Sequence, residues 1–205
     1  MTLKTLFLLA LLALPRLAGA QDLYEAPADP NASFVRVVAP GETLAVIGGT
    51  TFDNFQGGVT PFLLVAPGPI TVAVGNHEGK GDIAPASFYT FAPDKDGTLA
   101  LVQDLITNSP AKADLVFYNS SDLPLVDLYV PSVSAMALSD IAPGTSRQVS
   151  LKAPLRLDFE VRSKAGEVLA VLPGIQMERR AGVTVVFSGT GGSYTGYSTQ
   201  NTYAK

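Results

Sequence analysis

The chain consists of short apolar stretches that proline and glycine interrupt roughly every eight to twelve residues. Examples are SFVRVV, TLAVIG, PFLLVA, PITVAV, SFYTF and TLALVQ. Several alternate with period two, so that Ile70, Val72 and Val74 share one face of their stretch. This pattern is typical of short, half-buried β-strands. The nearest approach to a helical pattern, SVSAMALSD, is rich in serine and lies between Pro131 and Pro143. The sequence therefore predicts an all-β fold.

The same order of stretches occurs twice along the chain. The first half contains SFVRVVAPGETLAVIG, APGPITVAVGNHEG and ASFYTFAPDKDGTLAL, and the second contains DLVFYNSSDLPLVDLYV, KAPLRLDFEVRSKAG and GVTVVFSGTGGSYTGY. Residues 69–74 align with 154–159, and residues 87–91 align with 183–187. A repeated order of strands predicts two tandem β-sandwich domains of immunoglobulin-like type.

The first twenty residues, MTLKTLFLLALLALPRLAGA, have the layout of a secretory signal peptide. A basic residue, Lys4, precedes a short apolar run and a small-x-small motif that ends at Ala20. The run is too short to span a bilayer, and no longer one follows it. We expect cleavage of residues 1–20, export, and two domains at 21–107 and 108–205 joined by TNSPAKAD. One continuous sandwich of about fourteen strands is the alternative.

Cysteine content and charge exclude several classes of function. The chain has no cysteine, which excludes a disulfide scaffold, a thiolate nucleophile and a zinc–thiolate site. The leader removes Lys4 and Arg16 but no acid, so the net charge of -4 for the whole chain becomes -6 after cleavage. The one basic pair is Arg179-Arg180. Nucleic-acid binding needs a positive face, which this sequence lacks.

The single histidine, His77, is the only imidazole base available to an enzyme. It lies in GNHEG, at the place that RSKAG occupies in the second half, so we interpret it as an exposed residue of a hairpin turn. No serine lies in a G-x-S-x-G elbow, because GGSYT lacks the final glycine, and no His-Glu-x-x-His motif is present. The sequence thus predicts no catalytic residue, no metal site and no cofactor.

Two further motifs have simpler explanations than ligand binding. DKDG (Asp94 to Gly97) resembles part of a calcium loop, but the neighbouring residues supply too few oxygen ligands, and turn chemistry accounts for it. SGTGGSYTG (Ser188 to Gly196) is glycine-rich but lacks dinucleotide spacing and precedes no predicted helix, so we interpret it as a flexible loop.

Aromatic and basic residues outside the alternating stretches are the remaining contact candidates, because aromatic rings and arginine are common where proteins bind partners or sugars. These candidates are Phe52, Phe55, Arg179, Arg180, Tyr194 and Tyr197. The alternative for Phe52 and Phe55 is that they cap the first core. The alternative for the tail tyrosines is disorder or a last edge strand.

The segment LYEAPADPNASFVRVV resembles the start of the mature chain in the alginate O-acetylation protein AlgF family. Leu23-Tyr24 and Phe34-Val35-Arg36 are its sharpest pieces, and the resemblance extends over the whole mature chain. Related accessory proteins occur in cellulose acetylation systems, which leaves the polysaccharide open.

The resemblance implies a periplasmic accessory protein. It implies partners as well, namely a membrane-bound O-acyltransferase and periplasmic acetyltransferases of the SGNH-hydrolase type. We expect a non-catalytic adaptor that bridges these components. The main alternative is a carbohydrate-binding module that presents the polymer to them. An enzyme that transiently carries acetyl on serine, threonine or His77, and a self-associating surface protein, are further alternatives.

Overall fold

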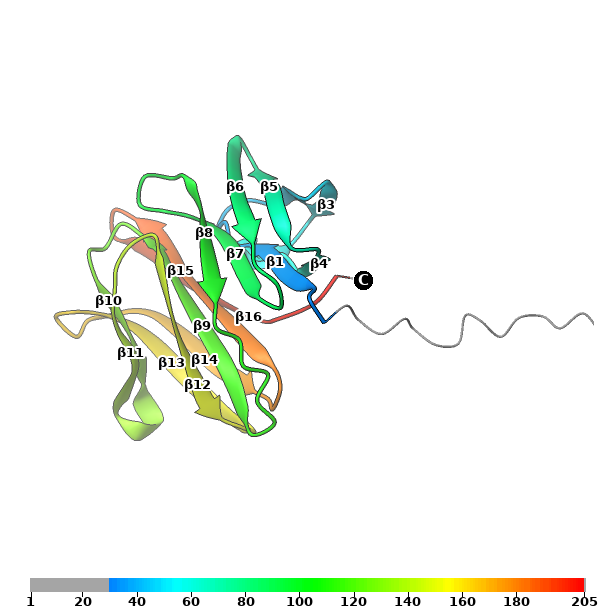
Figure 1. The fold of residues 1–205 in the computed structure, drawn as a ribbon. Helices are drawn as coiled ribbons and strands as arrows, with labels where there is room; N and C mark the ends of the chain where they lie inside the picture. The colour runs from blue at the N-terminus through cyan, green and yellow to red at the C-terminus, as the bar shows by residue number, and fades with distance from the viewer. Residues whose placement is uncertain (1–29, 205) are drawn as a thin grey trace, which may run out of the picture.

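The computed structural model describes residues 30–204, which form sixteen β-strands and two short 3-10 helices. The strands of the first half are β1 (Ser33–Val37), β2 (Leu44–Ile47), β3 (Thr50–Asp53), β4 (Leu63–Val65), β5 (Gly68–Val74), β6 (His77–Ile83), β7 (Phe88–Pro93) and β8 (Leu99–Asp104), with η1 (Gln56–Gly58) between β3 and β4 (Figure 1). The strands of the second half are β9 (Lys112–Ser121), β10 (Val126–Val130), β11 (Ala135–Ile141), β12 (Thr145–Lys152), β13 (Leu155–Ser163), β14 (Val168–Met177), β15 (Gly182–Thr190) and β16 (Ser193–Gln200), with η2 (Pro131–Val133) between β10 and β11.

The two halves have the same topology. The first half forms the sheets β4-β1-β7-β8 and β3-β2-β5-β6, and the second forms β12-β9-β15-β16 and β11-β10-β13-β14. Each strand of the second half thus has the same position in its sheet as the strand numbered eight lower in the first half; for example, β9 corresponds to β1. β1 pairs with β7 in parallel, and β9 pairs with β15 in parallel, whereas the other neighbouring strands are antiparallel. The prediction of an all-β fold with two tandem sandwich domains is confirmed.

The repeat in the sequence corresponds to this repeat in topology. Residues 69–74 lie on β5 and residues 154–159 reach onto β13, its counterpart, while 87–91 and 183–187 reach onto the counterparts β7 and β15. The change from one sandwich to the next falls between β8 and β9, while the boundary after residue 107 stays a prediction. The predicted signal peptide, its cleavage site and Leu23-Tyr24 lie outside the described residues. No helix of residues 30–204 is long and apolar enough to cross a membrane.

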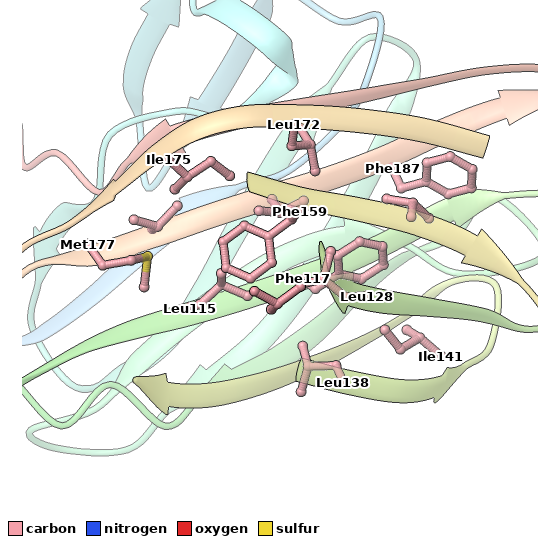
Figure 2. Packing of buried hydrophobic residues seen from close by; sticks show 14 of the residues in the cluster. Leu115, Phe117, Leu128, Leu138, Ile141, Phe159, Leu172, Ile175, Met177 and Phe187 are labelled. Carbon is pink, nitrogen blue, oxygen red and sulfur yellow. The ribbon is translucent and has the colours of Figure 1, made fainter. Parts of the chain in front are cut away.

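Each sandwich has its own apolar core. In the first, Val35, Val37 and Phe91 pack against Ile47 and Val72 of the facing sheet. In the second, the rings that fill the space between the sheets come from β9, β13 and β15, as Figure 2 shows. They are Phe117, Phe159 and Phe187, all fully buried. The period-two alternation in the sequence therefore marks residues that face these two cores.

The central strands of both halves are buried on both faces. β1, β7, β9 and β15 show almost continuous burial rather than alternating burial. The outward residues of β4-β1-β7-β8 pack on those of β12-β9-β15-β16, where Val38 and Ala92 join a cluster with Val116, Tyr118 and Val186. The molecule is thus a stack of four sheets, with an interdomain layer between the two cores. Parallel strands covered on both sides are expected to have such continuously apolar sequences.

Candidate functional site

The interdomain layer contains a buried ion pair at its centre. Arg36, on the outward face of β1, places Nη2 3.2 Å from Oδ2 of Asp104, which ends β8, and both side chains are 1% exposed. Its Nε donates to Oγ1 of Thr90 at 2.9 Å, and the Thr90 hydroxyl donates to the same Asp104 oxygen at 2.7 Å. The first sandwich thereby fixes one side of the guanidinium.

The second sandwich completes the bonding of this pair. Nη1 of Arg36 donates to Oγ1 of Thr184 at 2.6 Å and to Oδ1 of Asn201 at 2.9 Å. The Tyr118 hydroxyl donates to Oδ1 of Asp104 at 2.6 Å, and burial beside that carboxylate raises the pKa of Tyr118, so the phenol remains a donor. Because buried charges require hydrogen-bonding partners, this network holds the two sandwiches in one arrangement.

The ion pair is a positioning device and not a reaction centre. The Phe62 ring lies over the guanidinium at 4.3 Å from Cζ of Arg36 to the ring centroid, which covers the cation from a further side. Phe62 itself is fully buried. With both charged groups this deeply covered, a substrate has no route to them in this arrangement. The network fixes the position of the two sandwiches relative to each other.

The first outer surface, here called the rim patch, consists of Phe34, Leu64, Phe88 and Tyr203. Leu64 and Phe88 are the cross-strand partners of Phe34 on either side. The Phe34 and Phe88 rings stack with centroids 4.8 Å apart. Leu64 is 48% and Tyr203 47% exposed. A cavity of about 280 Å³ is lined by Phe34, Leu64, Phe88 and Pro30, but not by Tyr203. The patch is the uncovered edge of the interdomain layer.

The second outer surface, here called the outer row, crosses all four strands of β11-β10-β13-β14. Met136 pairs with Tyr129, Tyr129 with Glu160, and Glu160 with Val171. Cross-strand partners share a face of the sheet, so these residues lie side by side on the face away from the core. Met136 is 49% and Val171 59% exposed.

An arginine orders the middle of the outer row. Cζ of Arg162 lies 3.5 Å from the centroid of the Tyr129 ring. The same guanidinium pairs with Glu160 through Nε at 2.8 Å and Nη2 at 2.5 Å. Val168, 46% exposed, is the cross-strand partner of Arg162 and extends the apolar surface. Aromatic residues, methionine and arginine are the types enriched at the centre of protein interfaces.

The two surfaces belong to different layers of the stack. The rim patch lies on the first sandwich, and the outer row lies on the last sheet of the second, with β12-β9-β15-β16 between them. Each surface can therefore contact a different macromolecule at the same time. Since the Arg36 network fixes the sandwiches relative to each other, the distance between two such partners would also be fixed.

Each of the four aromatic contact candidates packs partly or fully against other residues of the molecule. Phe55 is 8% exposed and belongs to the first core, and Phe52 is half-buried and packs against it. Tyr194 packs against the second core and donates its hydroxyl to Asp122 at 2.8 Å. Tyr197 covers Gly57 of η1, where a Cβ atom would lie 2.0 Å from its ring. Phe52, Tyr194 and Tyr197 remain partly exposed, and the role of all four rings toward a partner stays a prediction.

The basic candidates are exposed at the β14–β15 connection. Arg179 donates Nε to the Ala153 carbonyl at 3.0 Å. The backbone N–H of Arg180, at φ 59°, donates to the Ser109 carbonyl at 3.1 Å. The structure thus gives both residues an anchoring contact, and their role toward a partner stays a prediction.

His77 is the first residue of β6 and is exposed, directly after the turn formed by Gly75 and Asn76. Its cross-strand partner is Val74. Among residues 30–204, no three histidine, aspartate or glutamate side chains are close enough to hold a metal ion. Asp94 uses Oδ1 to accept the backbone N–H groups of Asp96 and Thr98, as expected of a turn.

The glycine-rich stretch from Ser188 to Gly196 differs from its prediction. We expected a flexible loop, but most of it is strand, because Ser188 pairs with Thr195 and Thr190 with Ser193 across the β15–β16 hairpin. Gly191 and Gly192 supply the positive φ that the tight turn requires. The serine and threonine residues that resemble a loop composition are here the polar face of two paired strands.

A polar groove lies at the junction of the sandwiches. It encloses about 470 Å³ between the β7–β8 turn at Asp94 and the ends of β9 and β15 at Ser121 and Thr190. Asp122 in its wall accepts the Gly191 N–H and the Tyr194 hydroxyl, which lowers the pKa of its carboxyl group. The lining thus carries the carboxylates of Asp94 and Asp122 and the ammonium group of Lys95.

Comparison with known proteins gives a consistent family match. The model of the family described as "Alginate O-acetyl transferase AlgF" matches residues 6–173. The chain is similar to "Alginate biosynthesis protein AlgF" of Pseudomonas syringae pv. tomato, with 25% identity over 189 residues that cover 90% of this chain and 83% of that protein.

Among solved structures, the chain is similar to a carbohydrate-binding domain of family CBM26 from Eubacterium rectale Amy13K, in complex with maltoheptaose. The alignment covers 85% of this chain and 98% of the chain of that domain. Its sequence identity is 10% and its TM-score 0.29. A likeness at that level carries no argument about the fold or a ligand of this chain.

Proposed function

Because this chain belongs to the AlgF family, we propose that it is a non-catalytic adaptor of an alginate O-acetylation complex. Its partners in this proposal are a membrane-bound O-acyltransferase and periplasmic acetyltransferases of the SGNH-hydrolase type. The protein acts in the periplasm, after removal of residues 1–20. Cellulose is the alternative polymer, because related accessory proteins occur in cellulose acetylation systems.

The observation that carries this proposal is the pair of apolar surfaces on one fixed scaffold. The rim patch and the outer row expose large apolar side chains at Leu64, Tyr203, Met136 and Val171. Such patches on a water-exposed protein mark places where another macromolecule binds. A scaffold that holds two partners at a fixed separation raises their effective concentration even where each contact is weak.

The direct test is recovery of partners on the tagged mature chain from detergent-solubilised cells, identified by mass spectrometry. We expect a membrane O-acyltransferase or an SGNH-type acetyltransferase among the recovered proteins. The double variant Leu64→Glu with Val171→Glu, which changes one exposed residue of each surface, is the matched control and should recover neither. Equal recovery on both chains would contradict the adaptor proposal.

A catalytic role for this chain is the opposing interpretation, since the family description names an O-acetyl transferase. We expect His77→Ala to leave polymer acetylation in cells unchanged, because His77 is exposed on a hairpin and lies outside both surfaces. Acetyl content of the secreted polymer, compared with that of a deletion strain, measures this. An unacetylated polymer from the His77→Ala strain would make His77 a working residue.

The second candidate is a carbohydrate-binding module, which the polar groove at Asp94 and Asp122 favours by its size and its hydroxyl-bearing walls. Binding of purified, unacetylated polymer by the mature chain alone would support it. The adaptor proposal stands first because it rests on two exposed apolar surfaces, whereas the groove offers an anionic chain one cation, Lys95, beside two carboxylates.

A further inference from the structure

The C-terminal tail leaves the second sandwich and ends on the first. After β16, the chain crosses to the first sandwich, and Figure 1 shows the red segment that follows β16 passing close to β1 and β4. The Phe62 N–H donates to the Thr202 carbonyl at 2.8 Å, and the Ala204 N–H donates to the Phe62 carbonyl at 2.8 Å. Phe62 and Tyr203 form an isolated parallel bridge. The tail therefore adds an extended segment at the open edge of the sheet.

The ring of Tyr203 is seated in an aromatic cage. It meets Phe34 edge-on, with centroids 5.3 Å apart at 76°, and lies on Phe62 at 5.8 Å and 25°. Phe88 completes the cage through its own contacts with Phe34 and Phe62. Edge-to-face and offset-stacked pairs at these distances are favourable. The seat thus contacts the tail in two ways. The backbone of Phe62 hydrogen-bonds the extended tail, and the rings of Phe34 and Phe62 contact its aromatic side chain.

The tail covers this seat only in part. Tyr203 remains 47% exposed, and Leu64, the cross-strand partner of Phe34, is 48% exposed. Phe34, Leu64 and Phe88 line the cavity of about 280 Å³, and no residue of the tail lines it. In addition, the buried Nδ2 of Asn201, where the tail begins, finds no acceptor among the described residues, and an unsatisfied buried donor is unfavourable.

We propose that this seat, made of Phe34, Phe62, Leu64 and Phe88, is a docking site for an extended segment of a protein partner that carries an aromatic residue. In this structure the chain's own tail occupies it. The inference rests on the proposed function, since it names how one partner binds the rim patch. Addition of a strand to a sheet edge, with a pocket for one side chain, is a recurring mode of peptide recognition.

The tail acts as an internal competitor in this arrangement. A segment tethered next to its site has an effective concentration in the millimolar range, so a weak contact is enough to mask the seat. A partner segment that also fills the cavity beside Leu64 would displace it. Docking would then release Tyr203 from the seat. Asn201 precedes the displaced residues and would keep its hydrogen bond with Arg36.

The test uses a labelled peptide of the tail sequence, QNTYAK, and fluorescence anisotropy. The receptors are the unchanged mature chain, the same chain ended after Asn201, and the Tyr203→Ala chain. We expect both altered chains to bind the peptide at least about tenfold more tightly than the unchanged chain, because their seat is free. A peptide with alanine in place of tyrosine should not bind, and Phe34→Ala in the Tyr203→Ala chain should abolish binding, because Phe34 supplies the edge-on contact with the tyrosine ring.

Thermal melts establish that each receptor is folded. Failure of a folded Tyr203→Ala chain to bind the peptide, or binding that Phe34→Ala does not change, would overturn the docking site. The pull-down of partners on the unchanged chain tests the proposed function separately, because it does not depend on how the peptide binds. If an acetyltransferase is recovered equally with and without Leu64→Glu, the partner uses another surface and the seat is a purely intramolecular contact.

Discussion

Replacement of Arg36 by methionine is expected to lower the free energy of unfolding by about 3–5 kcal/mol, the usual cost of removing one member of a buried ion pair. Methionine retains most of the apolar stem but has no donor. The Asp104 carboxylate would then remain buried with only the hydroxyl groups of Thr90 and Tyr118, and Thr184 would lose the Arg36 donor. Urea unfolding of the mature chain measures the loss.

The matched control is Lys80→Met, which breaks the exposed pair of Lys80 with Glu78, whose side chains are 75% and 57% exposed. Exposed pairs contribute about 0–1 kcal/mol, so this variant should unfold close to the unchanged chain. The double variant Arg36→Met with Asp104→Leu removes both charges and should recover much of the stability. A loss below about 1 kcal/mol for Arg36→Met would contradict the role assigned to the network.

The second large effect is expected on the outer row. The double variant Met136→Glu with Val171→Glu should weaken binding of the partner at that surface by about 30-fold or more, since truncation of a central interface residue commonly costs 2 kcal/mol or more. Both side chains are about half exposed, so the fold should tolerate the charges. Surface plasmon resonance on the immobilised mature chain, with the acetyltransferases recovered from cells, measures the change.

A control for this variant is Thr71→Glu, on an exposed site of β5 in the first sandwich. It adds a charge on a polar surface and should leave both partners bound. The same outer-row variant should also reduce acetylation of the secreted polymer in cells. Unchanged affinity in the Met136→Glu, Val171→Glu chain would show that the outer row is not a partner surface.

The strands and their repeat could be predicted because they are local properties. The period-two pattern at Ile70, Val72 and Val74 identifies a strand without knowledge of its partner, and the repeated order identifies two similar units. The interdomain layer could not be predicted in this way. Arg36 and Tyr118 alternate with core residues along their strands, so their sequence fits an exposed face as well as a face covered by another sheet.

The residues of the two outer surfaces could not be predicted either, because their positions also depend on contacts between segments distant in the sequence. Phe55 lies in a stretch that resembles a loop, yet the chain folds it into the first core. Met136 and Val171 become neighbours only through the pairing of β11, β10, β13 and β14, which no local pattern specifies. A usable local signal was the unbroken apolar run from Val168 to Leu172, because a strand with one solvated face would ordinarily alternate apolar and polar residues.

An adaptor of this kind holds two different partners at once through its two surfaces. The most direct measurement is analytical ultracentrifugation of the mature chain mixed with the membrane O-acyltransferase in detergent and an SGNH-type acetyltransferase. We predict a ternary complex with the unchanged chain and only binary complexes after Leu64→Glu or after Met136→Glu with Val171→Glu. If the two enzymes compete for the chain, or associate equally well without it, the adaptor account is wrong.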